Sequence, residues 1–97
     1  MTKILVSPGF GAGWATWNDK PKEVAEYLPI IEFIEGGGDP KLLNESHDLI
    51  VKMKQDLELS SFYCGGASDL VVQSVAGPYR INEYDGSESV QTSVDFW

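Results

Sequence analysis

Hydrophobic and polar residues follow patterns along this chain that are typical of a small α+β domain. An apolar, β-prone run at residues 3–6 stops at a Ser-Pro-Gly turn, which predicts a short buried N-terminal strand. Three more β-prone stretches, at residues 70–75, 79–84 and 87–92, are separated by glycine-containing turns. They predict a C-terminal three-stranded antiparallel meander.

Helical spacing occupies the segment between these strands. Apolar residues recur with i, i+3, i+4, i+7 spacing from Val24 to Ile31, which predicts a helix that begins near residue 20. Pro29 lacks a backbone donor, so this helix either kinks there or restarts as a second short helix. A cap-and-proline pair, Asp39-Pro40, predicts another helix over residues 40–57. The expected fold is therefore one α+β domain over residues 1–97, with two to three helices.

Asp85-Gly86 is a strong hairpin signal, because a two-residue type I′ turn needs positive φ at both central positions. This turn pairs Glu83 with Glu88 and Ile81 with Val90, which places the two glutamates opposite each other at the end of an apolar face. Two interpretations stay open for the glutamates. They are solvated at an exposed turn, or they accept hydrogen bonds from a partner's N–H or cationic groups.

The opposite face of the hairpin is polar throughout and carries groups that donate or accept hydrogen bonds. Its members are Arg80, Asn82, Tyr84, Ser87, Ser89 and Gln91. This face is either an ordinary solvated surface or part of a binding site.

Charge changes the range of possible partners. Seven Lys and Arg residues against fifteen Asp and Glu residues give a net charge of −8 over 97 residues, without a basic cluster. Such a chain is poorly suited to bind long nucleic acid, because that affinity comes largely from cations on phosphates. Two classes of protein remain. One has an acidic surface that docks on a basic partner, and the other has a pocket whose local groups attract a ligand that the net charge would repel.

The chain also offers no apolar run near the roughly 20 residues that a membrane span needs. Its single cysteine, Cys64, excludes an internal disulfide, and we expect a buried structural thiol there. His47 lies on an apolar helical stripe without a spaced carboxylate, which favours a core or boundary role. The residues assemble no nucleophile, metal site or cofactor motif, so we expect a protein without catalytic activity, metal or cofactor.

The segment from Gly9 to Trp17 alternates glycines with aromatic residues. Its G-x-G-x-G pattern is followed by Trp14 rather than by a helix or by Lys-Ser/Thr, so it matches neither a dinucleotide fingerprint nor a P-loop. The glycines, Gly11 among them, let another group approach the backbone closely. Phe10, Trp14 and Trp17 either stack on bases or fill a core or subunit interface.

Three strings carry a resemblance that spans the chain: Pro-Gly-Phe-Gly-Ala-Gly-Trp at residues 8–14, Tyr-Cys-Gly-Gly-Ala at 63–67, and Arg-Ile-Asn-Glu-Tyr-Asp-Gly-Ser-Glu at 80–88. They resemble a family of small phage-encoded proteins, and the chain is similar to the viral sponges that antagonise CBASS immunity. The resemblance implies an oligomer, such as a tetramer, in the cytoplasm of the infected host cell. It would sequester cyclic di- or trinucleotides such as 3′3′-cGAMP without degrading them.

The resemblance also implies roles for individual residues. Trp14, Trp17 and Phe10 would stack on bases, while Arg80 and the backbone N–H groups around Gly11 would meet phosphate. Glu83 would accept hydrogen bonds from a guanine edge, and Asn82 and Tyr84 complete the candidate site.

Two other functions stay open. An acidic inhibitor of the anti-CRISPR or anti-restriction type would occupy the nucleic-acid groove of a host defence protein, with its carboxylates imitating phosphates. A minor virion or regulatory protein would bind no ligand at all.

Overall fold

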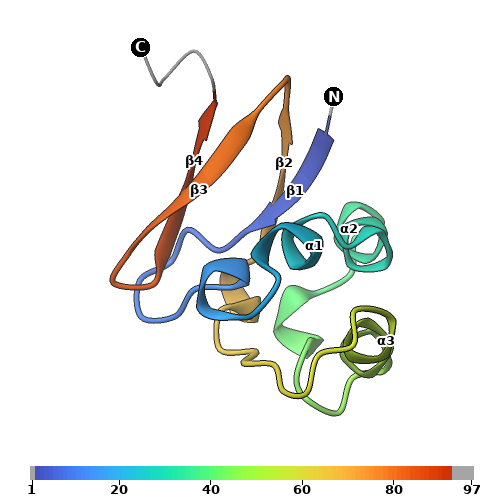
Figure 1. Cartoon of the computed structure of the whole chain (residues 1–97). Helices are drawn as coiled ribbons and strands as arrows, with labels where there is room; N and C mark the ends of the chain where they lie inside the picture. The colour runs from blue at the N-terminus through green and yellow to red at the C-terminus, as the bar shows by residue number, and fades with distance from the viewer. Residues whose placement is uncertain (1, 93–97) are drawn as a thin grey trace.

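Strands and helices are joined by irregular segments in the computed structural model of the chain, which describes residues 2–92 (Figure 1). The strands are β1 (Thr2–Val6), β2 (Val71–Val75), β3 (Tyr79–Tyr84) and β4 (Ser87–Thr92). The α-helices are α1 (Pro21–Ala25), α2 (Leu28–Glu35) and α3 (Asp48–Asp56), and the 3₁₀ turns are η1 (Ala15–Trp17), η2 (Pro40–Leu42) and η3 (Ala67–Asp69). The predicted α+β class is confirmed.

A proline separates the first two helices. Tyr27 is extended, with φ −68° and ψ 106°, and α2 begins at the next residue with Pro29 in its first turn. A proline is tolerated there because the first N–H groups of a helix have no partner within the helix. Of the two alternatives at this position, the chain takes the restart.

The predicted helix over residues 40–57 is wrong in its first half, since only η2 and α3 are helical there. Side chains divert the backbone between them. The amide of Ser46 donates to Asn44 Oδ1 at 2.9 Å, and the amide of Leu49 donates to Nδ1 of His47, the N-cap of α3, at 3.1 Å. Short polar side chains compete in this way with helical hydrogen bonds. His47 is half-buried, consistent with a boundary position.

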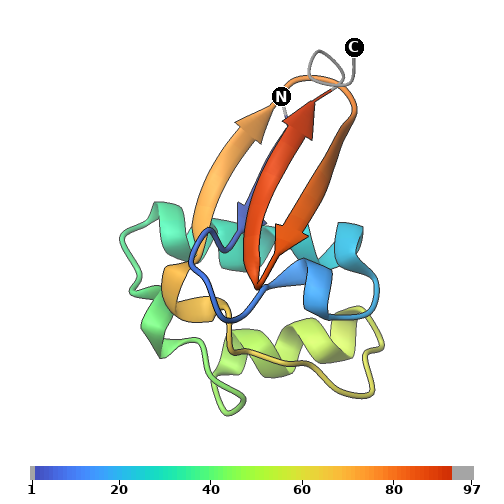
Figure 2. The same cartoon turned by 90° about the vertical axis from the view of Figure 1, so that its left-hand side faces the viewer.

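The strands form two separate antiparallel pairs, β1 with β2 and β3 with β4, so β2 is not joined to β3 in the connected meander that was predicted. β2 pairs with β1 instead. Ile4, Leu5 and Val6 of β1 are all at most 2% exposed, so this strand is buried on both faces and needs neighbouring elements that cover it. After β2 the chain turns at Gly77-Pro78 and enters the second ribbon. Figure 2 shows both ribbons projecting from a base that the helices form.

The β3–β4 hairpin has the register that the sequence predicts. Tyr84 pairs with Ser87, Glu83 with Glu88, and the pairing continues to Tyr79 opposite Thr92. Asp85 and Gly86 both have positive φ, at 49° and 86°, as a type I′ turn requires. The face with Ile81 packs against the core, in agreement with the expected apolar side.

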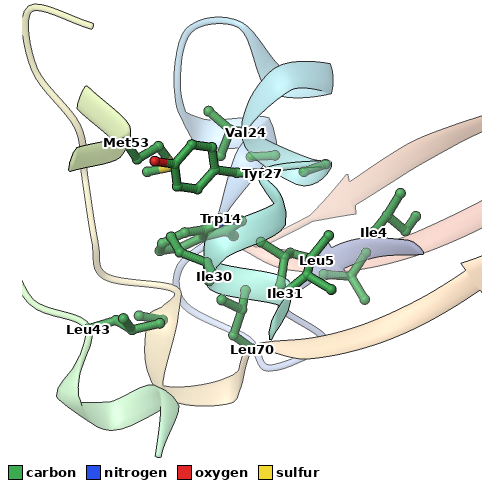
Figure 3. Packing of buried hydrophobic residues seen from close by; sticks show 14 of the residues in the cluster. Ile4, Leu5, Trp14, Val24, Tyr27, Ile30, Ile31, Leu43, Met53 and Leu70 are labelled. Atoms are coloured by element: carbon green, nitrogen blue, oxygen red, sulfur yellow. The ribbon is translucent and has the colours of Figure 1, made fainter. Parts of the chain in front are cut away.

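One hydrophobic cluster holds the elements together (Figure 3). Trp14 is fully buried in it and meets Phe62 edge-on, with ring centroids 4.8 Å apart. The cluster also takes buried side chains from α1, α2, α3, β1, β2 and the connecting segments. The indole nitrogen of Trp14 has no hydrogen-bond partner among residues 2–92, so the ring serves as a packing element.

Residues 60–64 form a connector rather than a strand. The side chain of Asn18 fixes this connector from η1: it accepts from the Tyr63 amide at 2.7 Å and donates to the Tyr63 carbonyl at 3.1 Å. Cys64 is a free thiol that is only partly buried, less than expected, and burial raises its pKa.

Candidate functional site

A cleft of about 630 Å³ lies between α1 and the start of β3. Small-molecule sites typically have ~300–1,000 Å³, so the cleft is large enough for a ligand of nucleotide size. Its lining comes from α1, from the turn into β3 and from single residues of β1 and η1. The lining residues are Thr2, Thr16, Pro21, Lys22, Glu26, Gly77, Pro78, Tyr79, Arg80 and Ile81.

A hydrogen bond in the wall of the cleft links the end of α1 to β3. The Tyr79 hydroxyl donates to Oε2 of Glu26, the residue that ends α1. Burial and this hydrogen bond raise the pKa of Tyr79 well above its ordinary value. Tyr79 is therefore a neutral donor at physiological pH, and Glu26 is the acceptor of the pair.

Lys22 shares the cleft with this pair. It lies one helical turn before Glu26, so both side chains project from the same side of α1. Arg80 also lines the cleft, but it follows Tyr79 on β3, so its side chain projects from the opposite face of the hairpin, where its Nε donates to Oε1 of Gln91 on β4 at 2.8 Å. The cleft therefore presents one ammonium group and one carboxylate together.

A carboxylate of the same chain binds amides on both sides of the glycine loop, which was predicted to meet phosphate. Glu88 is 2% exposed, and its side chain accepts hydrogen bonds from the amides of Ser7, Trp14 and Thr16 at 2.9–3.0 Å. The Thr16 hydroxyl adds a fourth at 2.6 Å. Neither open interpretation of Glu88 describes this arrangement, since the carboxylate is buried and bound internally. We call these contacts the Glu88 latch.

The predicted base-reading role of Glu83 also meets a competing arrangement. Its Oε2 accepts from the Gly86 amide at 2.7 Å. That bond, together with a second from the Trp17 side chain, holds the pKa of the Glu83 carboxyl below its usual value. Glu83 lies opposite Glu88 as predicted, and each carboxylate is compensated by its own donors.

The predicted aromatic residues separate into three environments. Trp14 is in the core and cannot stack on a ligand in this conformation. Trp17 is 42% exposed and stacks on Tyr63, with ring centroids 5.7 Å apart. Phe10 and Tyr84 are the most exposed, at 72% and 78%.

The loop around Gly11 lies against the tip of the hairpin. Gly11 donates to the Asp85 carbonyl at 2.7 Å, and the Ser87 hydroxyl donates to the Pro8 carbonyl at 2.7 Å. The group that approaches the glycine loop is therefore the chain's own hairpin. Asn82 lies on the strand between this tip and the cleft.

Of the eight predicted site residues, the cleft includes Arg80 alone. Sequence reasoning missed Lys22 and Glu26, although their i, i+4 spacing on a predicted helix was visible. Tyr79 lies two residues before Ile81 on the apolar face of the hairpin, so the alternation of the strand gave no sign of its polar role. The cleft joins residues 22 and 80, and only the tertiary fold brings these together.

Among residues 2–92, no three His, Cys, Asp or Glu side chains are placed to hold a metal ion. Within the same part of the chain, no helix has the length and apolar character to cross a membrane. Comparison of the chain with protein-family models, with curated proteins and with solved structures found no match.

Proposed function

We propose that this protein is a phage-encoded binding protein that sequesters a cyclic oligonucleotide second messenger, such as 3′3′-cGAMP, in the cytoplasm of the infected host cell. The observation that carries the proposal is the cleft between α1 and β3, which Lys22, Tyr79 and Glu26 line. The resemblance of the sequence to viral sponges supports it. A sponge acts by occupancy, so it needs binding groups and no catalytic set.

Each cleft residue has a matching partner on such a ligand. Lys22 suits a phosphate, because charge-assisted hydrogen bonds to phosphate are about twice as strong as neutral ones. The Tyr79 ring offers a surface on which a base can stack, worth roughly 1–3 kcal/mol. The net charge of −8 opposes a dianionic ligand at long range, so Lys22 must supply the local attraction.

A thermal-shift panel of cyclic di- and trinucleotides, with linear nucleotides as controls, tests this proposal. We expect a saturable rise in Tm with a cyclic ligand, and recovery of that ligand intact after the protein is denatured. Lys22→Ala should weaken binding about tenfold or more, because it removes a charge-assisted contact, whereas Arg80→Ala should weaken it less, because the Arg80 side chain projects from the opposite face of β3. Lys41→Ala, at an exposed lysine of η2, is the matched control. No shift with any cyclic nucleotide, or equal binding by all three variants, would contradict the proposal.

The proposal includes assembly into a homo-oligomer such as a tetramer. Extra burial between subunits would add to the single modest core of a 97-residue chain. Light scattering measures this directly, and a monomer at micromolar concentration would remove the oligomer from the proposal.

One observation favours a second candidate, the acidic inhibitor of a host defence protein. Phe10 and Tyr84 are largely exposed beside Asp85 at the hairpin tip, on a chain of net charge −8. Exposed aromatic residues on an acidic chain suit a basic protein surface. This function predicts binding to a basic defence protein that weakens steeply with salt and is lost in Phe10→Ala/Tyr84→Ala. The sponge function predicts that the same double variant still binds the cyclic nucleotide.

A further inference from the structure

We infer that two copies of this chain join through the outer edge of β2, as an antiparallel strand pair across a two-fold axis at Gln73. The inference rests on the proposed function only in that it names an interface for the homo-oligomer, and the interface needs no ligand. The residues that carry it are those of β2, Val71–Val75.

The outer edge of β2 is open. β2 pairs with β1 along its full length and, within residues 2–92, with no other strand. Alternate residues of a paired strand direct their N–H and C=O groups to the neighbour, so the remaining residues of β2 direct theirs away from β1. Figure 2 shows β2 as the leftmost strand, with no element beside this edge above the helical base. Such a row of backbone groups is a template for a further strand.

Charge distinguishes β2 from the other strands. Proteins commonly protect exposed edges with charged side chains, which oppose pairing with another chain. β2 has no charged residue, whereas β1, β3 and β4 each have at least one: Lys3, Arg80, Glu83 and Glu88. The ammonium group of Lys3, on the strand next to β2, is itself paired with Glu35 of α2 at 2.9 Å. On a chain of net charge −8, a second copy therefore meets least repulsion along β2.

The order of residues in β2 suits pairing with a copy of itself. An antiparallel pair centred on Gln73 places Val71 of each copy opposite Val75 of the other. Val71 is 42% exposed in the single chain, and in the pair it gains an apolar neighbour. The two exposed Gln73 side chains lie opposite each other at the axis, where each amide can both donate and accept. This self-complementarity favours a second copy over a partner of another sequence, and the contact closes as a dimer.

Light scattering of the full chain at micromolar concentration, without ligand, tests the interface. Gln73→Lys places two ammonium groups opposite each other at the axis, and we expect it to halve the molar mass of the unaltered chain. Ser89→Lys, at an exposed position of β4, adds the same charge to the other strand pair and should keep the full mass. Equal masses for all three proteins, whether monomeric or assembled, would overturn the inference.

A cross-linking arm tests the register and does not depend on the charge variant. In a Cys64→Ser background, Gln73→Cys brings two thiols to directly opposed positions, where Cα atoms are about 4.5–5.5 Å apart and a disulfide fits. Ser74→Cys is the matched control, because its two thiols lie two positions apart along the strands, with Cα atoms more than about 7 Å apart. Non-reducing electrophoresis should show at least tenfold more cross-linked dimer for Gln73→Cys. Equal cross-linking of the two variants, or none in Gln73→Cys, would overturn the pairing.

This interface and the proposed function can fail separately. A chain that is monomeric and binds a cyclic nucleotide in the thermal-shift panel would overturn the interface and leave the proposed binding. A dimer that passes both arms and shows no shift with any cyclic nucleotide would overturn the proposed function and support the interface.

Discussion

Glu88 organises a loop that contains almost no regular structure. Its carboxylate bonds the amides of three residues that lie 72 to 81 positions earlier in the chain. One of these residues, Thr16, also lines the cleft, so the Glu88 latch sets the position of a cleft wall. Sequence analysis placed Glu88 opposite Glu83 correctly. It could not reveal the latch, because the donors come from backbone groups whose direction depends on the fold.

Glu88→Ala should lower the free energy of unfolding by about 3–5 kcal/mol, since it leaves three backbone donors without partners. Glu88→Gln should lower it by about 2 kcal/mol, because it removes the charge and turns an N–H₂ group toward donors. Urea unfolding measures both changes. Glu45→Gln, at an exposed carboxylate, is the control and should stay within about 0.5 kcal/mol. An effect of Glu88→Gln as small as that of the control would show that the Glu88 latch does not stabilise the fold.

Tyr79 and Tyr27 give the fold a dependence on alkaline pH. Burial and hydrogen bonds, to Glu26 and Asp56 respectively, raise the pKa of each hydroxyl in the folded chain. An unfolded tyrosine titrates near pH 10. A raised folded pKa means that the stabilisation is complete below about pH 10 and is lost as the pH rises toward the folded value.

We therefore expect the free energy of unfolding to fall between pH 9 and pH 11.5, and to fall less in Tyr79→Phe and Tyr27→Phe. Urea unfolding across this range tests the expectation. At pH 8 each variant should lose about 1 kcal/mol through the missing hydrogen bond. The same pH slope in both variants and in the unaltered chain would contradict the assignment.

At the scale of elements, local chemistry made the hairpin predictable and tertiary contacts made other parts unpredictable. Asp85-Gly86 determines the β3–β4 turn within four residues, so both the turn and the full register were predicted correctly. The helix expected over residues 40–57 was half wrong because Asn44 and His47 bond the backbone outside helical geometry. The pairing of β2 with β1 depends on how β1 is buried, which the periodicity of β2 does not report.

The hairpin turn also fits closely against the glycine loop. A Cβ on Gly86 would lie 2.2 Å from the amide nitrogen of Ala12, and its φ of +86° is a conformation that L residues rarely adopt. Gly86→Ala should therefore destabilise the fold by about 3 kcal/mol, through backbone strain and separation of the tip from the loop.

Gly37→Ala is the matched control for this prediction. Its φ is also positive, at +95°, but its Cβ would meet nothing within 4 Å, so it should cost only about 1–2 kcal/mol. Equal losses of Tm in the two variants would show that the close contact with Ala12 adds nothing to the destabilisation in Gly86→Ala.

At the scale of the whole molecule, the proposed binding of an anion depends on the cleft, because the chain as a whole is acidic. Lys22 lies where α1 meets β3, while carboxylates such as Glu83 and Glu88 are bound by donors of the chain itself. Arg80 lines the same cleft, and its role in binding stays a prediction. Lys22, Glu26 and Tyr79 were missed as a group because 53 residues separate Glu26 from its partner Tyr79, and no local pattern links them.

The most direct measurement is a titration of the ¹⁵N-labelled chain with 3′3′-cGAMP, followed by ¹H–¹⁵N correlation spectra. Binding in the cleft should give saturable shifts that are largest for amides around Lys22, Glu26 and residues 79–81, with smaller changes at the hairpin tip. An unchanged spectrum at millimolar ligand, or shifts confined to Phe10, Tyr84 and their neighbours, would contradict the cleft as the binding site.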